Sequence, residues 1–214
     1  MATNIYIDGL NHYYGSLRGT RLKWVDLGEM CRRLLPRRDI RKIRYFTSRV
    51  NAFPHDRQAP ARQDIYLRAL RTVSNLTIYE GRFASRPRDL PRYPFVYNDP
   101  NRPPEHVRVM RTEEKRSVVN LATLLLFDCF NDEYDEAVVI SNDSDLTLPI
   151  EIVVNEFKKD VLVINPQPKG KVSQELVAAA TANYNRINRK VITESQFPAE
   201  LRDSKGIIRK PSSW

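Results

Sequence analysis

The sequence predicts an α/β protein whose central, mainly parallel sheet of about five strands lies between two layers of helices. Short runs rich in apolar and β-branched residues alternate along the chain with stretches of helical periodicity. The order strand, helix, strand, helix, strand predicts parallel pairing with right-handed crossovers. Two of the expected strands also run directly into acidic residues, which is typical of the carboxyl ends of strands in an open α/β sheet.

Each expected element follows from local patterning. Strands are expected where β-branched and aromatic residues cluster, and helices where apolar residues recur every three or four positions. Asp26 is a candidate cap for one helix, which Pro36 ends. The expected elements are strand 2–8, a loop or short helix at 11–17, helix 25–35, strand 42–47, helix 57–73, strand 76–81, short strand 107–112, helix 117–131, strand 137–140, helix 146–158, strand 161–165 and helix 173–188.

The chain is expected to form one domain, residues 1–190, followed by a C-terminal tail, residues 191–214, that packs back on it. The tail has little periodicity and is expected to be irregular. A Pro- and Arg-rich insertion at about 84–106 interrupts the alternation, and its prolines exclude a helix. Its arginines alternate with aromatic residues, which suits contact with single-stranded nucleic acid; the alternative is a solvated loop.

The composition bounds the partners and the compartment. A formal net charge of +9 and a pI near 9.7 favour polyanionic partners, although a soluble basic protein with solvated charges has the same composition. Cys31 and Cys129 make neither a disulfide framework nor a metal-ligand pattern, so a reducing compartment is expected. No signal sequence or long apolar run is evident, which predicts a cytoplasmic protein that does not span a membrane.

Three carboxylates stand at expected strand ends. Asp8 ends the first strand, and Asp143 and Asp145 follow the strand at 137–140. Brought into one cleft they would repel one another unless a cation neutralised them, and Mg²⁺ or Mn²⁺ is the natural occupant of an all-oxygen site. Such a site predicts phosphodiester hydrolysis. Taken singly, Asp145 is also a helix cap and Asp143 a turn former.

Three motifs carry a family resemblance: Tyr6-Ile-Asp-Gly-Leu-Asn11, Thr112-Glu-Glu-Lys-Arg-Ser-Val-Val-Asn-Leu-Ala122 and Ile140-Ser-Asn-Asp-Ser-Asp-Leu146. In this order, over residues 3–183, the chain resembles the NYN family of PIN-like nucleases. The resemblance implies a PIN-like three-layer α/β/α fold, dependence on a divalent metal, and endoribonuclease activity that leaves a 5′-phosphate. It also implies a homodimer, and it leaves an antitoxin or regulatory protein partner open.

The resemblance assigns roles to matching positions. It makes Asp8, Asp143 and Asp145 the metal ligands, Asn11 a helper that orients a carboxylate or the scissile phosphate, and Glu114 a completing acid. Single-stranded RNA is the expected partner. The residues expected to contact it are Arg86, Arg88, Arg92, Tyr93, Lys115 and Arg116. For Lys115 the alternative is an exposed lysine that is only solvated, in a loop, and contacts no phosphate.

Val118 departs from the family pattern, which usually has an acidic residue there. Glu114 and Val118 are four apart, so a helical first turn would put them on one face. Valine cannot bind a hard cation. Two explanations remain for the missing acid. The chain is a weakened or inactive form, natural or deliberately substituted, or Glu114 takes over the role of the missing acid. Alternatively, Val118 simply packs in the core.

Two other functions compete with the ribonuclease. One is a non-catalytic RNA-binding or regulatory module, and the other is a metal-dependent phosphatase or DNA nuclease.

Overall fold

The computed structural model describes residues 1–52, 54–94, 105–167, 172–184 and 186–214. Within these residues one seven-stranded sheet has the order β4-β3-β2-β1-β5-β6-β7, and all its neighbours are parallel except the antiparallel pair β3 and β4. The strands are β1 (Ala2–Asp8), β2 (Asp39–Arg49), β3 (Leu76–Pro91), β4 (His106–Lys115), β5 (Glu136–Ile140), β6 (Asp160–Ile164), β7 (Ala182–Tyr184), β8 (Glu200–Asp203) and β9 (Gly206–Arg209).

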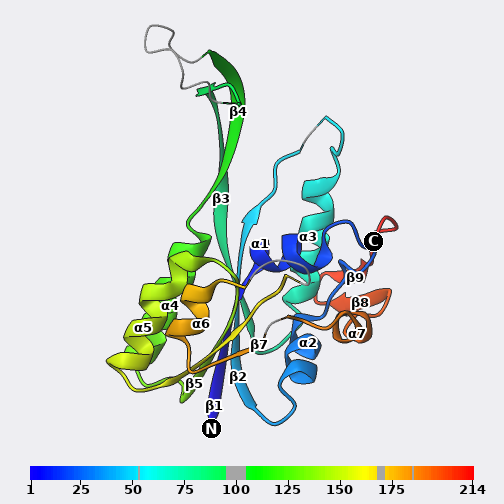
Figure 1. Cartoon of the computed structure of the whole chain (residues 1–214). Coiled ribbons are helices and arrows are strands. Elements are labelled where there is room, and N and C mark those ends of the chain that lie inside the picture. The colour runs from blue at the N-terminus through cyan, green and yellow to red at the C-terminus, as the bar shows by residue number, and fades with distance from the viewer. Residues whose placement is uncertain (53, 95–104, 168–171, 185) are drawn as a thin grey trace, which may run out of the picture.

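Helices cover both faces of the sheet (Figure 1). One layer, formed by α4, α5 and α6, packs on the face that carries Tyr6 and Phe46, and the other layer packs on the face that carries Ile5 and Ile7. The helices are α1 (Gly9–His12), η1 (Tyr13–Leu17), α2 (Leu27–Leu34), α3 (Ala59–Leu70), α4 (Ser117–Phe130), η2 (Ser144–Leu146), α5 (Thr147–Asn155), α6 (Gln174–Ala179) and α7 (Arg189–Glu194). The expected three-layer α/β architecture is confirmed.

The middle of the sheet is apolar on both faces, as parallel strands covered by two helix layers require. All seven residues of β1 and all five of β5 are buried. In the register of the sheet, Ile7 of β1 lies opposite Ile140 of β5, and Asp8 lies opposite Phe46 of β2. The carboxyl ends of these three strands therefore meet at one edge of the sheet.

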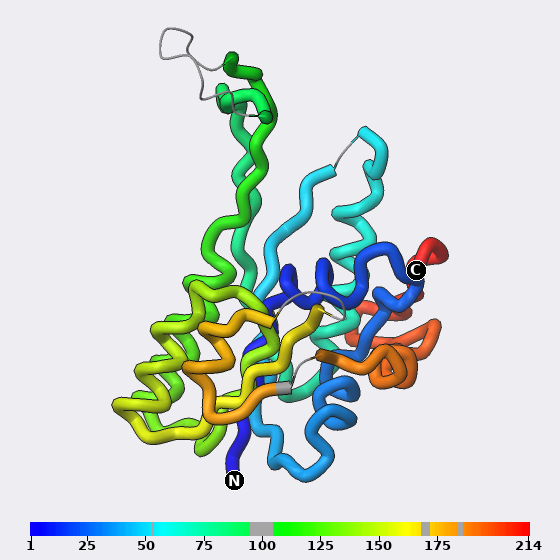
Figure 2. Tube along the Cα trace, viewed as in Figure 1, coloured from blue at the N-terminus to red at the C-terminus, as the bar shows by residue number. Residues whose placement is uncertain are grey.

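The insertion expected at about 84–106 does not interrupt the sheet in its described part. β3 continues to Pro91 and pairs with β4 as a long two-stranded arm that projects from the domain (Figure 2). Strand β2 pairs with β3 only as far as Arg82, so Pro87 and Pro91 lie where β3 has one neighbour and a missing N–H is tolerated. Residues 95–104 of the expected insertion lie outside the described residues.

Two further expectations differ from the structure. The helix expected at 173–188 ends at Ala179, because Thr181 and the strand β7 pair with β6 instead; tertiary pairing overrides the helix propensity of an Ala-rich run. The sheet therefore has seven strands within the described residues, not about five. The tail, expected to be irregular, instead contains most of α7 and the β8–β9 hairpin, and it buries Phe197 and Ile208 in the core. Among the described residues no helix is both long enough and apolar enough to cross a membrane.

Candidate functional site

Asp8 lies at the carboxyl end of β1, where the chain turns into α1, and is only 3% exposed. Its Oδ1 accepts the backbone N–H of Asn11 (3.0 Å), and its Oδ2 accepts the Asn11 amide (3.2 Å) and the Ser141 hydroxyl (2.9 Å). Burial raises the pKa of Asp8, and the nearby Asp143 carboxylate adds to the rise, while these hydrogen bonds oppose it. The chain thus holds a buried acid in one fixed orientation.

The turn after β5 brings a second carboxylate to Asp8. Ser141 joins the two, since its hydroxyl donates to Asp8 and accepts the backbone N–H of Asp143 (3.1 Å). Asp143 in turn caps the 3₁₀ turn η2 by accepting the backbone N–H of Asp145 at 3.1 Å. The side chain of Asp145 is exposed, and its role as a metal ligand stays a prediction.

Glu114 lies near the same edge of the sheet, at the base of the arm. Its Oε1 accepts the Ser48 hydroxyl (2.5 Å) from β2 and the backbone N–H of Ser117 (3.1 Å) at the start of α4. Gly81 of β3 makes room for it, because a Cβ there would lie 2.5 Å from the Glu114 carboxylate. Only glycine fits this position, so β3 contributes to placing Glu114.

Val118 and Glu114 do not share a helix face, so that expectation is wrong. Glu114 is still in strand β4, and Arg116 has a left-handed backbone (φ 89°) that separates the strand from α4. Val118 is half-buried and packs against the apolar cluster that includes Leu121 and Leu125. The side chain therefore has a packing role whatever else the position does.

The acids suit a magnesium-type ion with few protein ligands. Within the described residues no three His, Cys, Asp or Glu side chains lie close enough together to hold a metal. Mg²⁺ is commonly bound by one or two carboxylates, with water and substrate phosphate completing its shell. Asn11 and Ser141 orient the Asp8 carboxylate, and Asp143 is near enough to influence its pKa; the role of these acids as metal ligands stays a prediction.

The arm carries a basic face that begins beside Glu114. Side chains alternate along each strand, so one face of the β3–β4 ribbon gathers the cations. Glu113 pairs with two of them, Arg111 at 2.7 Å and Lys115 at 2.8 Å. The residues of this basic face are Arg82, Ala84, Arg86, Arg88, Arg111, Glu113 and Lys115.

The six residues expected to contact RNA divide between several places. Arg86, Arg88 and Lys115 belong to the basic face. Arg92 pairs with Glu105 (2.9 Å) farther along the arm. The remaining two are exposed: Tyr93 is 89% exposed on the arm, and Arg116 lies at the junction of β4 and α4.

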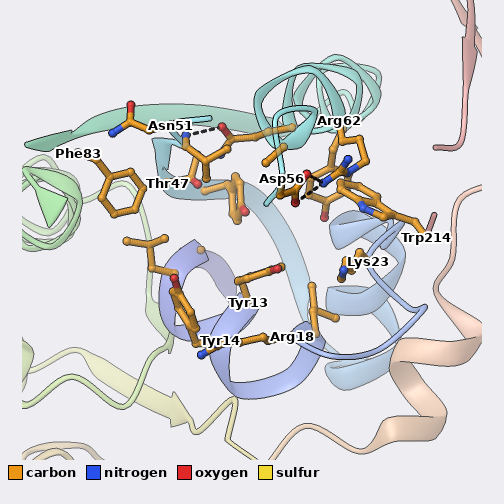
Figure 3. A pocket seen from close by; sticks show the side chains of 18 of the residues that line it. Tyr13, Tyr14, Arg18, Lys23, Thr47, Asn51, Asp56, Arg62, Phe83 and Trp214 are labelled. Atoms are coloured by element: carbon orange, nitrogen blue, oxygen red, sulfur yellow. Dashed lines mark hydrogen bonds and ion pairs between the residues drawn. The ribbon is translucent and has the colours of Figure 1, made fainter. Parts of the chain in front are cut away.

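A pocket of about 310 Å³ is lined by Tyr45 and Thr47, on the face of β2 opposite to the one where Ser48 binds Glu114 (Figure 3). The segment after Asp8 forms one wall, with Gly9, Tyr13 and Tyr14, and the start of α3 forms another. A Cβ on Gly9 would lie 2.6 Å from the Phe46 carbonyl and 2.7 Å from the Tyr45 ring, so glycine permits the close approach of α1 to β2. No feature of the sequence pointed to this pocket, because its walls come from distant segments.

The family model of the NYN domain matches residues 2–187. This chain belongs to the NYN domain family. NYN domains are PIN-like nuclease domains, so the expected family is confirmed.

Two other proteins are similar to this NYN domain, one in sequence and one in fold. The 6-hydroxy-3-succinoylpyridine 3-monooxygenase of Pseudomonas putida is 27% identical over an alignment of 241 residues, which covers 100% of this chain and 75% of the relative. The crystal structure of a protein of unknown function from Vibrio parahaemolyticus superposes with a TM-score of 0.53 at 16% identity, covering 85% of this chain and 90% of that one. The second likeness shows the fold alone.

Sequence reasoning about this NYN domain missed the two serines that hold the acids. Ser48 fixes Glu114, and Ser141 joins Asp8 to Asp143. Ser141 carried a weak signal, since it is the first polar residue after an apolar strand. Ser48 carried none, because its partner lies 66 residues away in the sequence.

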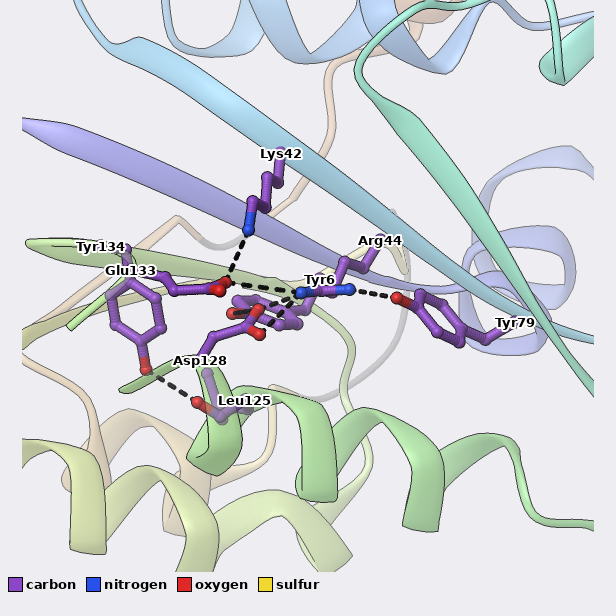
Figure 4. A network of polar contacts seen from close by, with 8 residues as sticks. All are labelled: Tyr6, Lys42, Arg44, Tyr79, Leu125, Asp128, Glu133 and Tyr134. Carbon is purple, nitrogen blue, oxygen red and sulfur yellow. Dashed lines mark hydrogen bonds and ion pairs between the residues drawn. The ribbon is translucent and has the colours of Figure 1, made fainter. Parts of the chain in front are cut away.

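A buried polar network fixes α4 of this NYN domain against the sheet (Figure 4). Arg44 donates two hydrogen bonds of 2.6 Å to Asp128, and the Tyr6 hydroxyl donates a third of 2.6 Å to the same carboxylate. Arg44 also donates to the hydroxyl of Tyr79. Asp128 is fully buried, and burial raises the pKa of Tyr6, so the phenol stays a donor. The network therefore holds α4, the helix that begins beside Glu114, against β1 and β2.

Proposed function

We propose that this NYN domain is a metal-dependent ribonuclease whose centre is the pair Asp8 and Asp143. The observation that carries the proposal is the Ser141 bridge, which links the buried Asp8 carboxylate to the backbone N–H of Asp143 at the carboxyl ends of β1 and β5. The accessible Asp143 carboxylate is near enough to Asp8 to help raise its pKa, which supports a shared site. Membership of a nuclease domain family supports the same reaction class. Mg²⁺ or Mn²⁺ is the proposed cofactor, and RNA the proposed substrate.

Each residue has a definite part in this proposal. Asp8 and Asp143 would hold the ion, while Asn11 and Ser141 fix the orientation of Asp8. When bound, the ion supplies a polarised phosphoryl oxygen and a water of lowered pKa. Asp145 and Glu114 are proposed to act at the same edge of the sheet.

The basic face of the arm is proposed to bind the phosphates of the substrate. It presents five cations against one carboxylate, and Arg82, Arg86 and Arg88 form no salt bridge within the described part of the chain. Residues 82 and 88 lie about 20 Å apart along an extended strand, which is long enough to follow several nucleotides. Among the described residues of this face there is no aromatic side chain, so we expect contact with the phosphate backbone rather than with the bases.

The test is Mn²⁺-dependent degradation of a fluorescent RNA of mixed sequence. The wild type should cleave it, Asp143→Asn should not, and Asp39→Asn, which removes an exposed acid at the opposite end of β2, should behave as the wild type. Equal cleavage by Asp143→Asn and the wild type would refute the site. Single-stranded DNA and a mononucleotide as alternative substrates separate a ribonuclease from a DNA nuclease and a phosphatase.

Binding by the arm has its own test with a matched control. Arg86→Gln with Arg111→Gln should weaken RNA binding and lower the slope of log K against log salt by about 1.4, which is about 0.7 for each lost phosphate contact to a single strand. Arg108→Gln removes a cation from the opposite face of the same ribbon and should change little. An equal loss in all variants would exclude the basic face as the binding surface.

A non-catalytic RNA-binding module is the second candidate, and the packing of Val118 in the apolar cluster favours it. The expected behaviour of such a module is RNA binding without cleavage, both in the wild type and in Val118→Asp.

A third candidate comes from the name of the Pseudomonas relative, which is oxygen insertion into a hydroxypyridine ring. The aromatic pocket beside Gly9 favours it. Incubation with 6-hydroxy-3-succinoylpyridine, ¹⁸O₂ and a reduced nicotinamide or flavin tests it. Oxidation of the reductant together with a pyridine product that carries ¹⁸O would support this reaction, whether or not the succinoyl group on C3 is released.

A further inference from the structure

The pocket on the far side of β2 has aromatic walls. We define its floor as the two buried tyrosines that line it, Tyr45 and Tyr66. The less buried Tyr13, Tyr14 and Trp214 belong to its rim (Figure 3). The rings of Tyr66 and Trp214 lie 5.8 Å apart, and those of Tyr13 and Tyr14 lie 5.3 Å apart. A volume of about 310 Å³ is the size of a small-molecule site. Flat aromatic surfaces of this kind favour a planar ring by stacking or edge contact.

The rim of the pocket is positively charged. Arg18, Lys23 and Arg62 line it against a single acid, Asp56. Arg62 is bound to Asp56, with contacts of 2.5 and 2.6 Å, and is occupied. Arg18 lies 5.2 Å from the centre of the Tyr14 ring, and neither Arg18 nor Lys23 forms a salt bridge within the described residues. Two cations are therefore available to an anionic group.

The floor offers few free hydrogen-bonding groups. The hydroxyl of Tyr66 donates to the Val25 carbonyl (2.9 Å), and the Gln63 side chain is used by the backbone of Ser48 and Val50. Burial raises the pKa of Tyr45 to about 12, so its phenol stays neutral. A ligand rich in hydroxyl or amide groups would leave those groups unpaired on this floor, which is costly. An apolar ring with its charge at the rim has no such cost.

From these features we infer that the pocket is a binding site for a small aromatic acid, a planar ring that carries one carboxylate or phosphate. The ring lies on Tyr45 and Tyr66, and the anion contacts Arg18 and Lys23. A free aromatic carboxylate fits these features better than a nucleotide, which has the ring and the anion but also ribose hydroxyls and base amides that the floor would leave unpaired. The experiment below distinguishes the two.

The pocket adjoins the acidic centre, since Gly9 and Tyr45 line it, but neither Asp8 nor Asp143 belongs to its lining. Gly9 and Thr47 line it, whereas their chain neighbours Asp8 and Ser48 do not. Asp8 belongs to the contacts near Asp143, and Ser48 binds Glu114. Ligand binding therefore needs neither the metal nor Asp8, and it does not rest on the ribonuclease proposal.

Isothermal titration of the full chain with nicotinate and with uridine 5′-monophosphate, in EDTA, tests the inference. We expect a Kd below about 1 mM for at least one of them, and at least tenfold weaker binding of cyclohexanecarboxylate, which lacks the planar ring, and of nicotinamide, which lacks the charge. Preference for nicotinate would assign the site to free aromatic acids, and preference for the nucleotide would assign it to a nucleotide. Failure of both probes to bind, or equal binding of the two control compounds, would overturn the inference.

Variants locate the site. Arg18→Gln combined with Lys23→Gln should weaken binding at least tenfold, whereas Arg21→Gln, an exposed arginine between them that does not line the pocket, should leave it unchanged. Asp143→Asn should bind the ligand as the wild type does, so loss of RNA cleavage and loss of ligand binding are separable. Unchanged binding in the Arg18 and Lys23 variant would place the ligand elsewhere and refute the assignment.

Discussion

Replacement of Val118 by aspartate tests whether this position has lost a catalytic acid. Val118 is half-buried, and full burial of a valine contributes roughly 1.5–3 kcal/mol, so the substitution should cost about 1 kcal/mol of packing. An acid in the first turn of α4 regains about 0.3–1 kcal/mol from the positive end of the helix. The net loss of unfolding free energy should therefore stay below about 1 kcal/mol, and Tm should fall by less than about 4 °C.

The assay is cleavage of a fluorescent RNA across a Mn²⁺ titration. If position 118 has lost an acid, Val118→Asp should cleave at least about tenfold faster than the wild type, equivalent to about 1.4 kcal/mol of transition-state stabilisation. Val119→Asp is the matched control, because Val119 is 67% exposed in the same helical turn and faces away from the core. Equal rates for the wild type and both variants at every Mn²⁺ concentration would refute the lost-acid interpretation.

Two other substitutions have opposite expected effects on stability. Asp8→Asn should abolish cleavage yet raise the free energy of unfolding by about 0.5–2 kcal/mol in metal-free buffer at pH 7, because burial raises the pKa of Asp8 and its charge disfavours the fold. That destabilisation develops as the pH rises from the unfolded pKa through the raised folded pKa, so denaturation curves of wild type and variant should coincide near pH 3; a constant difference would contradict the reasoning. Asp128→Ala leaves Arg44 and Tyr6 without their shared acceptor and should cost about 3–5 kcal/mol, a fall in Tm of roughly 10 °C, whereas Glu151→Ala at an exposed acid of α5 should change Tm little. Similar melting of the two alanine variants would show that the network is not needed for stability.

The parallel core was predictable because its signal is local. Fully buried strands read as continuous apolar runs, and the ends of such runs mark the functional edge of the sheet. Asp8 after β1 and Asp143 after β5 were found this way. The arm was missed because of its prolines. A proline cannot donate a backbone hydrogen bond and is excluded from a strand that pairs on both sides. Nothing in the sequence indicates that β3 extends beyond the end of β2, where it pairs on one side only.

The finer parts of the site depend on contacts that the sequence does not display. Ser48 binds Glu114 only once β2, β3 and the start of α4 are assembled. Gly81 is needed because a Cβ at that position would clash with both of these side chains. The helical relation expected between Glu114 and Val118 failed because one left-handed residue, Arg116, ends the strand between them. Spacing of four residues is informative only inside a continuous helix.

The most direct measurement is an anomalous difference map from a crystal of the wild-type chain soaked in Mn²⁺. We predict one peak that contacts carboxylate oxygens of both Asp8 and Asp143 at roughly 2.0–2.6 Å, and its loss in Asp143→Asn crystals. A map with no peak between these two side chains, or with manganese bound only elsewhere, would contradict the proposal that the edge formed by β1 and β5 is a metal-dependent catalytic centre.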